Sequence, residues 1–244
     1  MFRHRGNRRS YTHNLRLASL LSFVAGMVNI TGLLSINILT TNLTGHFAYF
    51  SESFVHQNFA HASHFLLFIL SFMLGAFICG LISEALSRNK QNLLYVVPIL
   101  IEIAALLIIA FFGIQNNIFN TRFIACTLLF AMGLQNSLVT RVSQSVVRTT
   151  HLTGIFTDLG NEISLLFFNH ESKEKREIKR GIYLKVAVIS CFFLGGILGG
   201  LAYTFMELKV LIIACGILVI ALLYDYILLK YYTVKRKVLH SHVK

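Results

Sequence analysis

The chain carries few charges. Asp, Glu, Lys and Arg make up 13% of its 244 residues, and hydrophobic residues make up 55%. Soluble domains carry about 25% charged residues, so this shortage places the chain outside their usual range and favours a membrane protein. Acidic residues are scarcer than basic ones, 10 against 22. Because the basic residues lie in short tails and loops between apolar stretches, positive-inside anchoring explains them better than nucleic-acid binding does.

Residues for metal or catalytic chemistry are also sparse. The sequence has no P-loop, Gly-rich dinucleotide loop, nucleophile elbow or HEXXH pattern. Its four cysteines lie inside apolar stretches without metal-ligand spacing, so we expect them to pack as small hydrophobic side chains. Four histidines gather in one segment, but no Cys, Asp or Glu is close enough to complete a site. We therefore expect no enzyme activity, cofactor or metal. The four cysteines are Cys79, Cys126, Cys191 and Cys215, and the four histidines are His46, His56, His61 and His64.

Six apolar stretches are each close to the roughly 20 residues that an α-helix needs to cross a bilayer. We therefore expect an all-α, polytopic membrane helical bundle. The stretches cover about 15–37, 64–85, 93–113, 122–141, 182–204 and 208–230.

The chain has room for one compact bundle and no separate soluble domain. We expect a cytoplasmic N-tail over 1–14, a single transmembrane domain over 15–230 and a basic cytoplasmic C-tail over 231–244. The basic run RHRGNRRS before the first apolar stretch resembles the start of a signal peptide. That stretch is too long for a signal sequence and lacks a small-residue cleavage pattern, so we expect it to be a retained span.

One polar pattern occurs twice. GMVN at 26–29 returns as GLQN at 133–136, an offset of 107, and TTNLTG at 40–45 returns as TTHLTG at 149–154, an offset of 109. A third pair, LGAFICG and LGGILGG, lies at an offset of 120. A duplicated membrane unit with a polar Thr-Gly segment in each half is typical of transporters and channels built from two repeats.

The charges favour six crossings over seven or eight. Segments 39–56 and 149–168 are too polar for ordinary spans and too apolar for plain loops. If both cross, five basic residues fall outside, namely Arg88, Lys90, Arg141, Arg148 and Lys209. If both instead dip into the membrane and return, only Arg122 and Lys209 of the 22 basic residues are external. The positive-inside rule then predicts a multi-pass membrane protein with both termini in the cytoplasm.

Each half contributes three spans. Because three is an odd number, the second half enters the membrane from the opposite side, and the repeats are expected to be inverted. We expect repeat 1 over about 15–113 and repeat 2 over about 121–230, each with three spans plus a re-entrant or broken Thr-Gly helix. Gly45 and Gly154 would permit a bend, and Thr44 and Thr153 would cap the half-helices that follow. Each half-helix N-terminus would present free N–H groups and a positive dipole end to an anion or polar solute. Close helix packing by small residues is the alternative.

The motifs GMVNITG, TTNLTGHF, MGLQNS and RTTHLTGIFTDLG resemble the YoaK-like family of bacterial inner-membrane proteins, whose domain has no assigned function. The resemblance covers about 15–230 and implies a multi-pass membrane fold. Two positions depart from the family pattern. Asn29 stands where many members carry Asp, and His46 stands where Asn often follows the Thr-Gly pair. If that Asp couples transport to protons in the family, a non-titrating Asn removes the role here.

Acidic residues inside apolar stretches are costly in lipid and usually face the bundle interior. Glu102 lies in the middle of a span, four residues after the chain's only proline, Pro98, which predicts a kinked helix. Asp158 and Glu162 follow the second Thr-Gly at i, i+4 and share a helix face. These three are candidates for proton coupling, and a structural or interfacial role is the alternative for each.

The sequence thus predicts a transporter or channel for a small polar or anionic solute. The substrate would bind between the repeats, through side chains and backbone around the two Thr-Gly segments. The predicted partners are membrane lipid and this solute, with no nucleic acid and a possible homo-oligomer. A non-transporting scaffold or partner protein is the alternative, with Asn29, Gln135 and Asn136 as hydrogen-bonding glue between helices. The predicted binding residues are Asn29, Thr44, Gly45, His46, Gln135, Asn136, Thr153 and Gly154.

Overall fold

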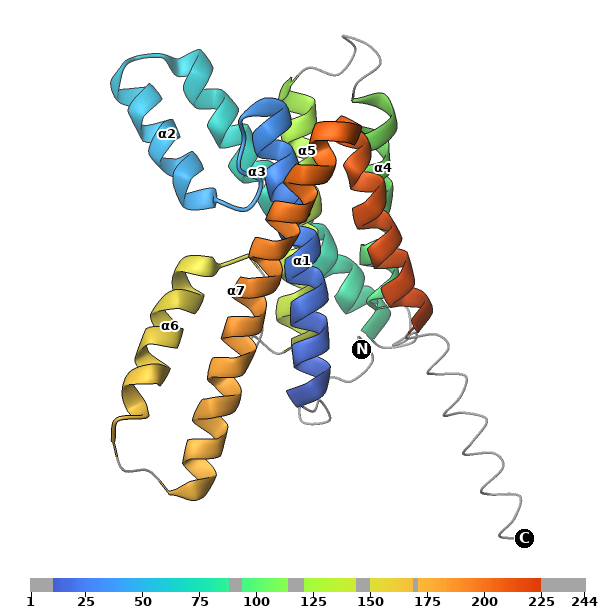
Figure 1. Cartoon of the computed structure of the whole chain (residues 1–244). Helices are drawn as coiled ribbons and strands as arrows, with labels where there is room; N and C mark the ends of the chain where they lie inside the picture. The colour runs from blue at the N-terminus through green and yellow to red at the C-terminus, as the bar shows by residue number, and fades with distance from the viewer. Residues whose placement is uncertain (1–10, 88–93, 114–120, 144–149, 169–170, 225–244) are drawn as a thin grey trace, which may run out of the picture.

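A computed structural model describes residues 11–87, 94–113, 121–143, 150–168 and 171–224, and the regular structure in these ranges is helical. The predicted C-tail at 231–244 and most of the N-tail lie outside the described residues. Figure 1 gives the arrangement. The elements are α1 (Tyr11–Ile36), α2 (Leu43–Val55), α3 (Phe59–Ser87), α4 (Val96–Phe112), α5 (Thr121–Ser143), α6 (Leu152–Leu165), α7 (Ser172–Met206), the 3-10 turn η3 (Glu207–Lys209) and a final helix whose described part is 210–224.

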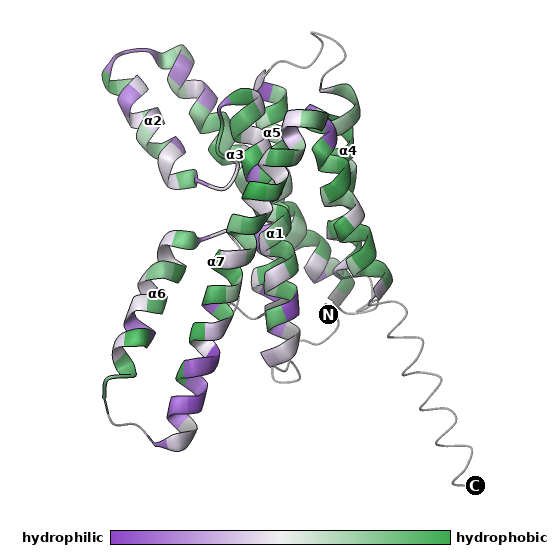
Figure 2. Ribbon diagram, viewed as in Figure 1, coloured by the Kyte–Doolittle hydropathy of each residue, from purple (hydrophilic) through white to green (hydrophobic). Residues whose placement is uncertain are grey.

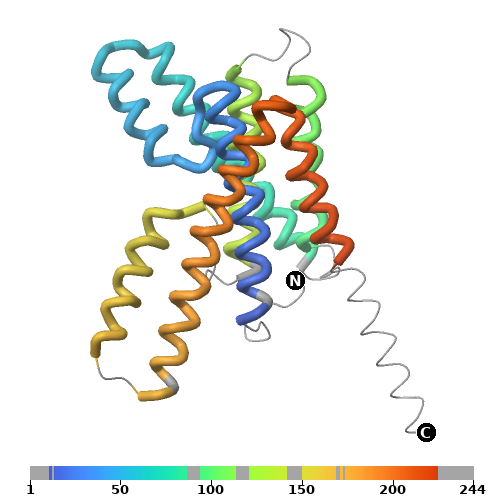
Figure 3. Tube along the Cα trace, in the orientation of Figure 1, coloured from blue at the N-terminus to red at the C-terminus, as the bar shows by residue number. Residues whose placement is uncertain are grey.

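Each of the six predicted spans corresponds to one of these helices. By length and apolar composition, four segments could cross a membrane, and α4 is a shorter apolar helix of 17 residues. The four segments are Asn14–Ile36, Phe59–Leu86, Thr121–Arg141 and Glu174–Tyr224. The last contains α7, η3 and the helix over 210–224, so it holds two of the predicted spans. The start of α1 and the last described residues of the final helix lie at the same end of the bundle (Figure 3). There, Arg16 Nη1 donates to the Tyr224 hydroxyl at 3.2 Å.

The two Thr-Gly segments form short helices. α2 has 13 residues and α6 has 14, and at 1.5 Å per residue each is about 20 Å long, too short to cross the roughly 30 Å hydrocarbon core. Among the described residues, α2 packs against α3 and α6 packs against α7. In Figure 1 the N-terminal ends of both short helices lie near mid-height, and the helices run toward opposite ends of the bundle.

The tightest helix pairs are α1 with α7 and α3 with α5. At the first crossing, a Cβ added to Gly26 would overlap the carbonyl oxygen of Phe192, and one added to Gly195 would overlap that of Phe23. At the second crossing, Gly75 meets the carbonyl of Phe130 and Gly133 meets that of Phe72 in the same way. Only glycine lets two helix backbones approach this closely.

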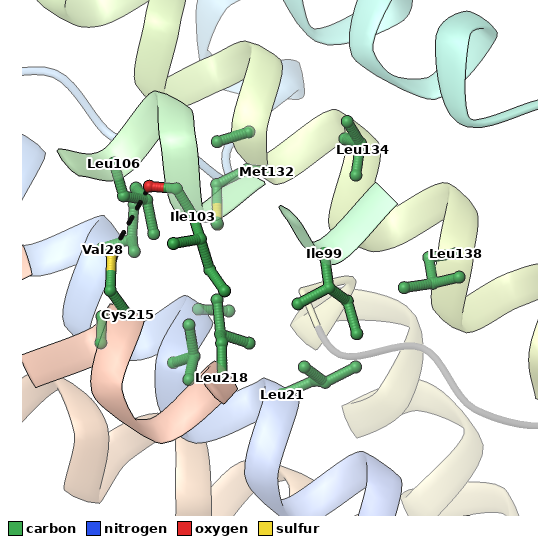
Figure 4. Packing of buried hydrophobic residues seen from close by; sticks show 14 of the residues in the cluster. Leu21, Val28, Ile99, Ile103, Leu106, Met132, Leu134, Leu138, Cys215 and Leu218 are labelled. Carbon is green, nitrogen blue, oxygen red and sulfur yellow. Dashed lines mark hydrogen bonds between the residues drawn. The ribbon is translucent and has the colours of Figure 1, made fainter. Parts of the chain in front are cut away.

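The core lies where these crossings meet α4 and the final helix. Figure 4 shows Ile99, Ile103 and Leu106 of α4 among side chains of α1, α5 and the final helix. The outward faces are also apolar (Figure 2), with Phe77 60% exposed and Phe193 66% exposed. A soluble monomer rarely exposes such contiguous apolar surface, so these faces suit a lipid environment.

Candidate functional site

The chain reverses direction after α1 and is tied back onto that helix. Asn37 has a left-handed φ of 56° and donates its N–H to the carbonyl of Leu33 at 3.0 Å, which ends the helix. Asn29 Oδ1 then accepts hydrogen bonds from the N–H of Thr41 at 3.2 Å and from its hydroxyl at 3.0 Å. The amide predicted to face a substrate therefore holds the loop over 37–42 against α1.

His46 fixes the other side of this loop. Its side chain is 3% exposed, and its Nε2 lies 2.9 Å from the carbonyl oxygen of Leu39. Because a carbonyl only accepts, the ring carries its proton on Nε2. The ring packs against Phe65 and Phe68 of α3, at centroid distances of 6.2 and 5.7 Å. His46 thus joins the loop, α2 and α3.

The N-cap of α2 is Asn42, which corrects the prediction that Thr44 caps the half-helix. Asn42 Oδ1 accepts the N–H of Gly45 at 3.1 Å, as an N-cap side chain does for the third helical residue. Thr44 lies within the first turn and is exposed. Gly45 does not form a bend either. A Cβ there would lie 2.7 Å from Asn42 Nδ2, so its lack of a side chain leaves room for the cap.

The second Thr-Gly segment has the same layout with a different cap residue. α6 begins after His151, which makes no side-chain capping hydrogen bond. A Cβ on Gly154 would overlap the His151 ring, so this glycine again accommodates the residue before the helix. Thr153 is exposed within the first turn, and its carbonyl accepts from the hydroxyl of Thr157 at 3.0 Å. Thr153 is therefore not the cap.

One of the two predicted amides on α5, Gln135, contacts α1. Gln135 is fully buried, and its Nε2 donates to the carbonyl of Leu21 at 3.0 Å. Its Oε1 has no hydrogen-bond partner among the described residues, and neither does the buried hydroxyl of Ser22 beside Leu21. Asn136, one residue further along, is half-buried. Gln135 thus links α5 to α1.

Glu102 is fully buried in the core, and neither of its carboxyl oxygens has a hydrogen-bond partner among the described residues. The predicted kink at Pro98 is not present. Pro98 is the third residue of α4, in the first turn, where a helix needs no N–H donor.

The three predicted proton-coupling residues lie in separate environments. Glu162 of α6 accepts an ion-pairing hydrogen bond from Lys185 Nζ of α7 at 2.6 Å. It also lies beside Gly181, where an added Cβ would be 2.6 Å from Glu162 Oε1. Asp158 is exposed on α6. Only Glu102 is a buried acid without a described partner, which makes it the strongest of the three candidates.

The structure also contains features that the predicted site does not include. An apolar groove of about 640 Å³ lies between α1, α7 and the final helix, lined by Leu15, Arg16, Ser19, Leu20, Phe23, Cys191, Ile217, Ile220, Ala221 and Tyr224. None of these belongs to the predicted site. The His61 and His64 rings pack at 5.8 Å near the start of α3. In the described part of the chain, no group of three His, Cys, Asp or Glu side chains is arranged to hold a metal ion.

Residues 17–224 match a family described as a protein of unknown function, DUF1275. The chain belongs to the DUF1275 family. It is 26% identical over 216 residues to the UPF0700 transmembrane protein YoaK of Bacillus subtilis (strain 168), a match that covers 84% of this chain and 92% of that protein. No solved structure matches. The predicted family resemblance is confirmed, and this DUF1275 member is a multi-pass helical transmembrane protein.

The DUF1275 match begins within α1 and ends at the last described residue of the final helix. The family unit therefore includes both short helices and both glycine crossings. Sequence reasoning missed three residues that organise the Thr-Gly segments, namely Thr41, Asn42 and His151. Asn42 was detectable, because Asn is a preferred N-cap and it occupies the place in the first segment that His151 occupies in the second.

Proposed function

We propose that this DUF1275 protein moves a small polar or anionic solute across the bacterial inner membrane, with the solute bound near the N-termini of α2 and α6. The observation that carries the proposal is that both short helices begin near mid-height of the bundle and run toward opposite ends (Figure 1). Irregular backbone at membrane depth is tolerated only when it is buried in protein or lines a wet cavity. A helix that starts there directs free N–H groups and a positive dipole end toward that cavity.

The proposal includes an inverted duplication, and the glycine crossings support it. Phe23 and Gly26 of α1 correspond to Phe130 and Gly133 of α5 at the offset of 107. Phe72 and Gly75 of α3 correspond to Phe192 and Gly195 of α7 at the offset of 120. When both offsets are applied, the contact of Gly26 with Phe192 corresponds to that of Gly133 with Phe72. The contact of Gly195 with Phe23 likewise corresponds to that of Gly75 with Phe130. Two equivalent crossings around one centre would let the halves rock against each other during transport.

Glu102 would serve as the proton-coupling group in this scheme. It belongs to α4 of the first half, and its carboxyl has no described partner in the core. A carboxyl that forms no fixed ion pair remains able to exchange a proton. No catalytic residue or cofactor is part of the proposal.

A non-transporting scaffold is the second candidate, and one observation favours it. Asn29, His46 and Gln135 each form hydrogen bonds to backbone or side-chain groups of the protein itself, as packing residues would. A scaffold would leave both Thr-Gly segments packed and dry.

Uptake into proteoliposomes containing the purified protein, across a panel of small polar and anionic solutes, distinguishes the two. We expect Gly45→Leu and Gly154→Leu to abolish uptake of the transported solute, because each forces the cap residue away from the half-helix. Gly160→Leu is the matched control on α6, since no atom lies within 4 Å of a Cβ added there. Folded protein that transports no solute of the panel, or full activity in both cap variants, would favour the scaffold.

A further inference from the structure

The first three turns of α7 carry a purely cationic face. Lys175, Arg176, Lys179 and Arg180 recur at i, i+1, i+4 and i+5, and Ser172 and Tyr183 extend the same side of the helix. These six residues line a shallow depression of about 460 Å³. Figure 2 shows this end of α7 as its most hydrophilic part.

The acidic residues of the same segment lie opposite the cationic face or at its edges. Around the helix axis, Glu174 lies about 170° and Glu177 about 130° from the middle of the cationic face, at 100° per residue. Glu171, the N-cap of α7, lies at i, i+4 from Lys175, and Glu177 lies at i, i+3 from Arg180, so acidic residues flank the face at both edges. Between these edges, the residues that line the face include four cations and no acidic side chain.

The depth of this face relative to the bilayer follows from α7 itself. Residues 186–206 contain no charged side chain and span about 30 Å, the thickness of the hydrocarbon core. Arg180 lies about 9 Å beyond that stretch along the axis, and Lys175 lies about 16 Å beyond it. The long Lys and Arg side chains bring their charges back toward the headgroup layer.

Aromatic contacts place the same end of the bundle at an interface. The Arg180 guanidinium lies 5.8 Å from the ring centroid of Tyr11, which ties the cationic face to the start of α1. Tyr183, at the end of the face nearest the apolar part of α7, is 67% exposed. Phe167, just after α6, is 86% exposed. Tyrosine and cationic residues at one level are typical of the zone between hydrocarbon and headgroups.

We propose that the face of α7 formed by Ser172, Lys175, Arg176, Lys179, Arg180 and Tyr183 binds the phosphate headgroup of an anionic phospholipid. The cations neutralise the phosphate, the Ser172 hydroxyl donates to a phosphate oxygen, and Tyr183 packs against the glycerol and upper acyl region. Arginine suits this role because its planar guanidinium contacts two phosphate oxygens at once. The face goes beyond the transport proposal and does not depend on it.

The test measures lipid binding by native mass spectrometry of the full-length protein in detergent. Phosphatidylglycerol and phosphatidylcholine with the same acyl chains are titrated separately. We expect wild-type protein to retain phosphatidylglycerol preferentially. Replacing Lys175, Arg176, Lys179 and Arg180 together by Gln should weaken phosphatidylglycerol binding by about tenfold or more and leave phosphatidylcholine binding unchanged.

The matched control removes four cations elsewhere. Replacing Lys235, Arg236, Lys237 and Lys244 by Gln changes the net charge equally, and we expect it to leave the lipid preference largely intact. Equal losses in both variants would overturn the proposal, because net charge alone would then explain binding. An unchanged lipid preference in the α7 variant would also overturn it and leave the face to an acidic protein partner. Displacement of the lipid by millimolar inorganic phosphate would assign the face to a soluble anion instead.

Discussion

Among the individual residues, Glu102 is unusual because it is a buried acid without a described hydrogen-bond partner. Most buried polar groups in folded proteins form hydrogen bonds, and leaving one unsatisfied costs about 1–3 kcal/mol. Glu102 carries two such oxygens inside an apolar core. Groups that lower stability in this way are commonly retained for function, so the stability of Glu102 variants is informative before any solute is known.

We expect Glu102→Leu to raise the midpoint of thermal unfolding in detergent. Leucine fills a similar volume and removes the unsatisfied carboxyl, which should stabilise the fold by about 1–3 kcal/mol. Glu102→Gln keeps a polar group in the same place and should give no comparable rise. Reaction of a thiol-specific dye with the buried cysteines Cys79 and Cys215 reports unfolding. A lower midpoint for the Leu variant would mean that the carboxyl has a partner in the folded protein.

Asn29 offers a sharper test, because its hydrogen bonds to the N–H and the hydroxyl of Thr41 use the same acceptor atom, Oδ1. Aspartate in its place keeps that acceptor, whereas leucine removes it. We therefore expect Asn29→Asp to fold and keep the loop over 37–42 in place, and Asn29→Leu to lose about 1–3 kcal/mol of stability. Limited proteolysis within the loop, compared with the circular dichroism melting curve, measures both effects. Equal stability of the two variants would show that the Thr41 contacts contribute little.

Some residues of the site were predictable from the sequence, and their partners were not. An amide before each Thr-Gly segment was expected to lie at the site, and Asn29 does lie beside the first one. Its partner Thr41 depends on a chain reversal through the left-handed Asn37, which no repeat or hydropathy pattern indicates. The mistaken cap at Thr44 has the same origin, since helix ends shift by one or two residues more easily than helices appear or disappear.

Close packing of glycine against backbone determines how the elements fit together. The repeated sequence pattern aligns Gly26 with Gly133, but only the structure reveals that Gly26 faces a backbone carbonyl of α7 and Gly133 faces one of α3. Hydropathy predicts where helices cross the membrane and contains no information about which helices meet.

We expect Gly26→Ala and Gly133→Ala each to prevent recovery of folded protein. The added methyl group would overlap a backbone carbonyl oxygen, which cannot rotate away as a side chain can. Gly216→Ala in the final helix is the control, because no atom lies within 4 Å of its Cβ position. Size-exclusion chromatography after detergent extraction measures the folded fraction. A monodisperse Gly133→Ala protein would indicate that the α3 and α5 crossing can separate.

Helix α7 is longer than the membrane span that the sequence predicts within it. The apolar pattern predicted a span from about 182, and the helix begins ten residues earlier at Ser172. The extra turns are rich in Lys, Glu and Arg, which are good helix formers but unfavourable in lipid. Sequence hydropathy therefore predicted the apolar part of α7 and missed the polar helical extension before it.

For the whole molecule, the arrangement of ends gives a direct prediction of topology. The connection between α2 and α3 lies at one end of the bundle, and the start of α7 lies at the other (Figure 1). We expect a cysteine at Gln57 to react with a membrane-impermeant reagent added outside the cell, and a cysteine at Ser172 to react only after permeabilisation. Both are introduced into a protein whose four native cysteines are replaced. External labelling at Ser172 would reverse the orientation.

The crossed pairing of the halves has a consequence for how the protein is made. α1 packs against α7, and α3 packs against α5, so the main partner of α1 is synthesised more than 130 residues later. During biosynthesis the Gly26 surface of α1 therefore stays uncovered in the membrane until α7 is inserted. A chain truncated after α4 would leave both glycine surfaces open. The two halves are therefore expected to assemble only together, as separately expressed fragments that meet in one membrane or as a single uninterrupted chain.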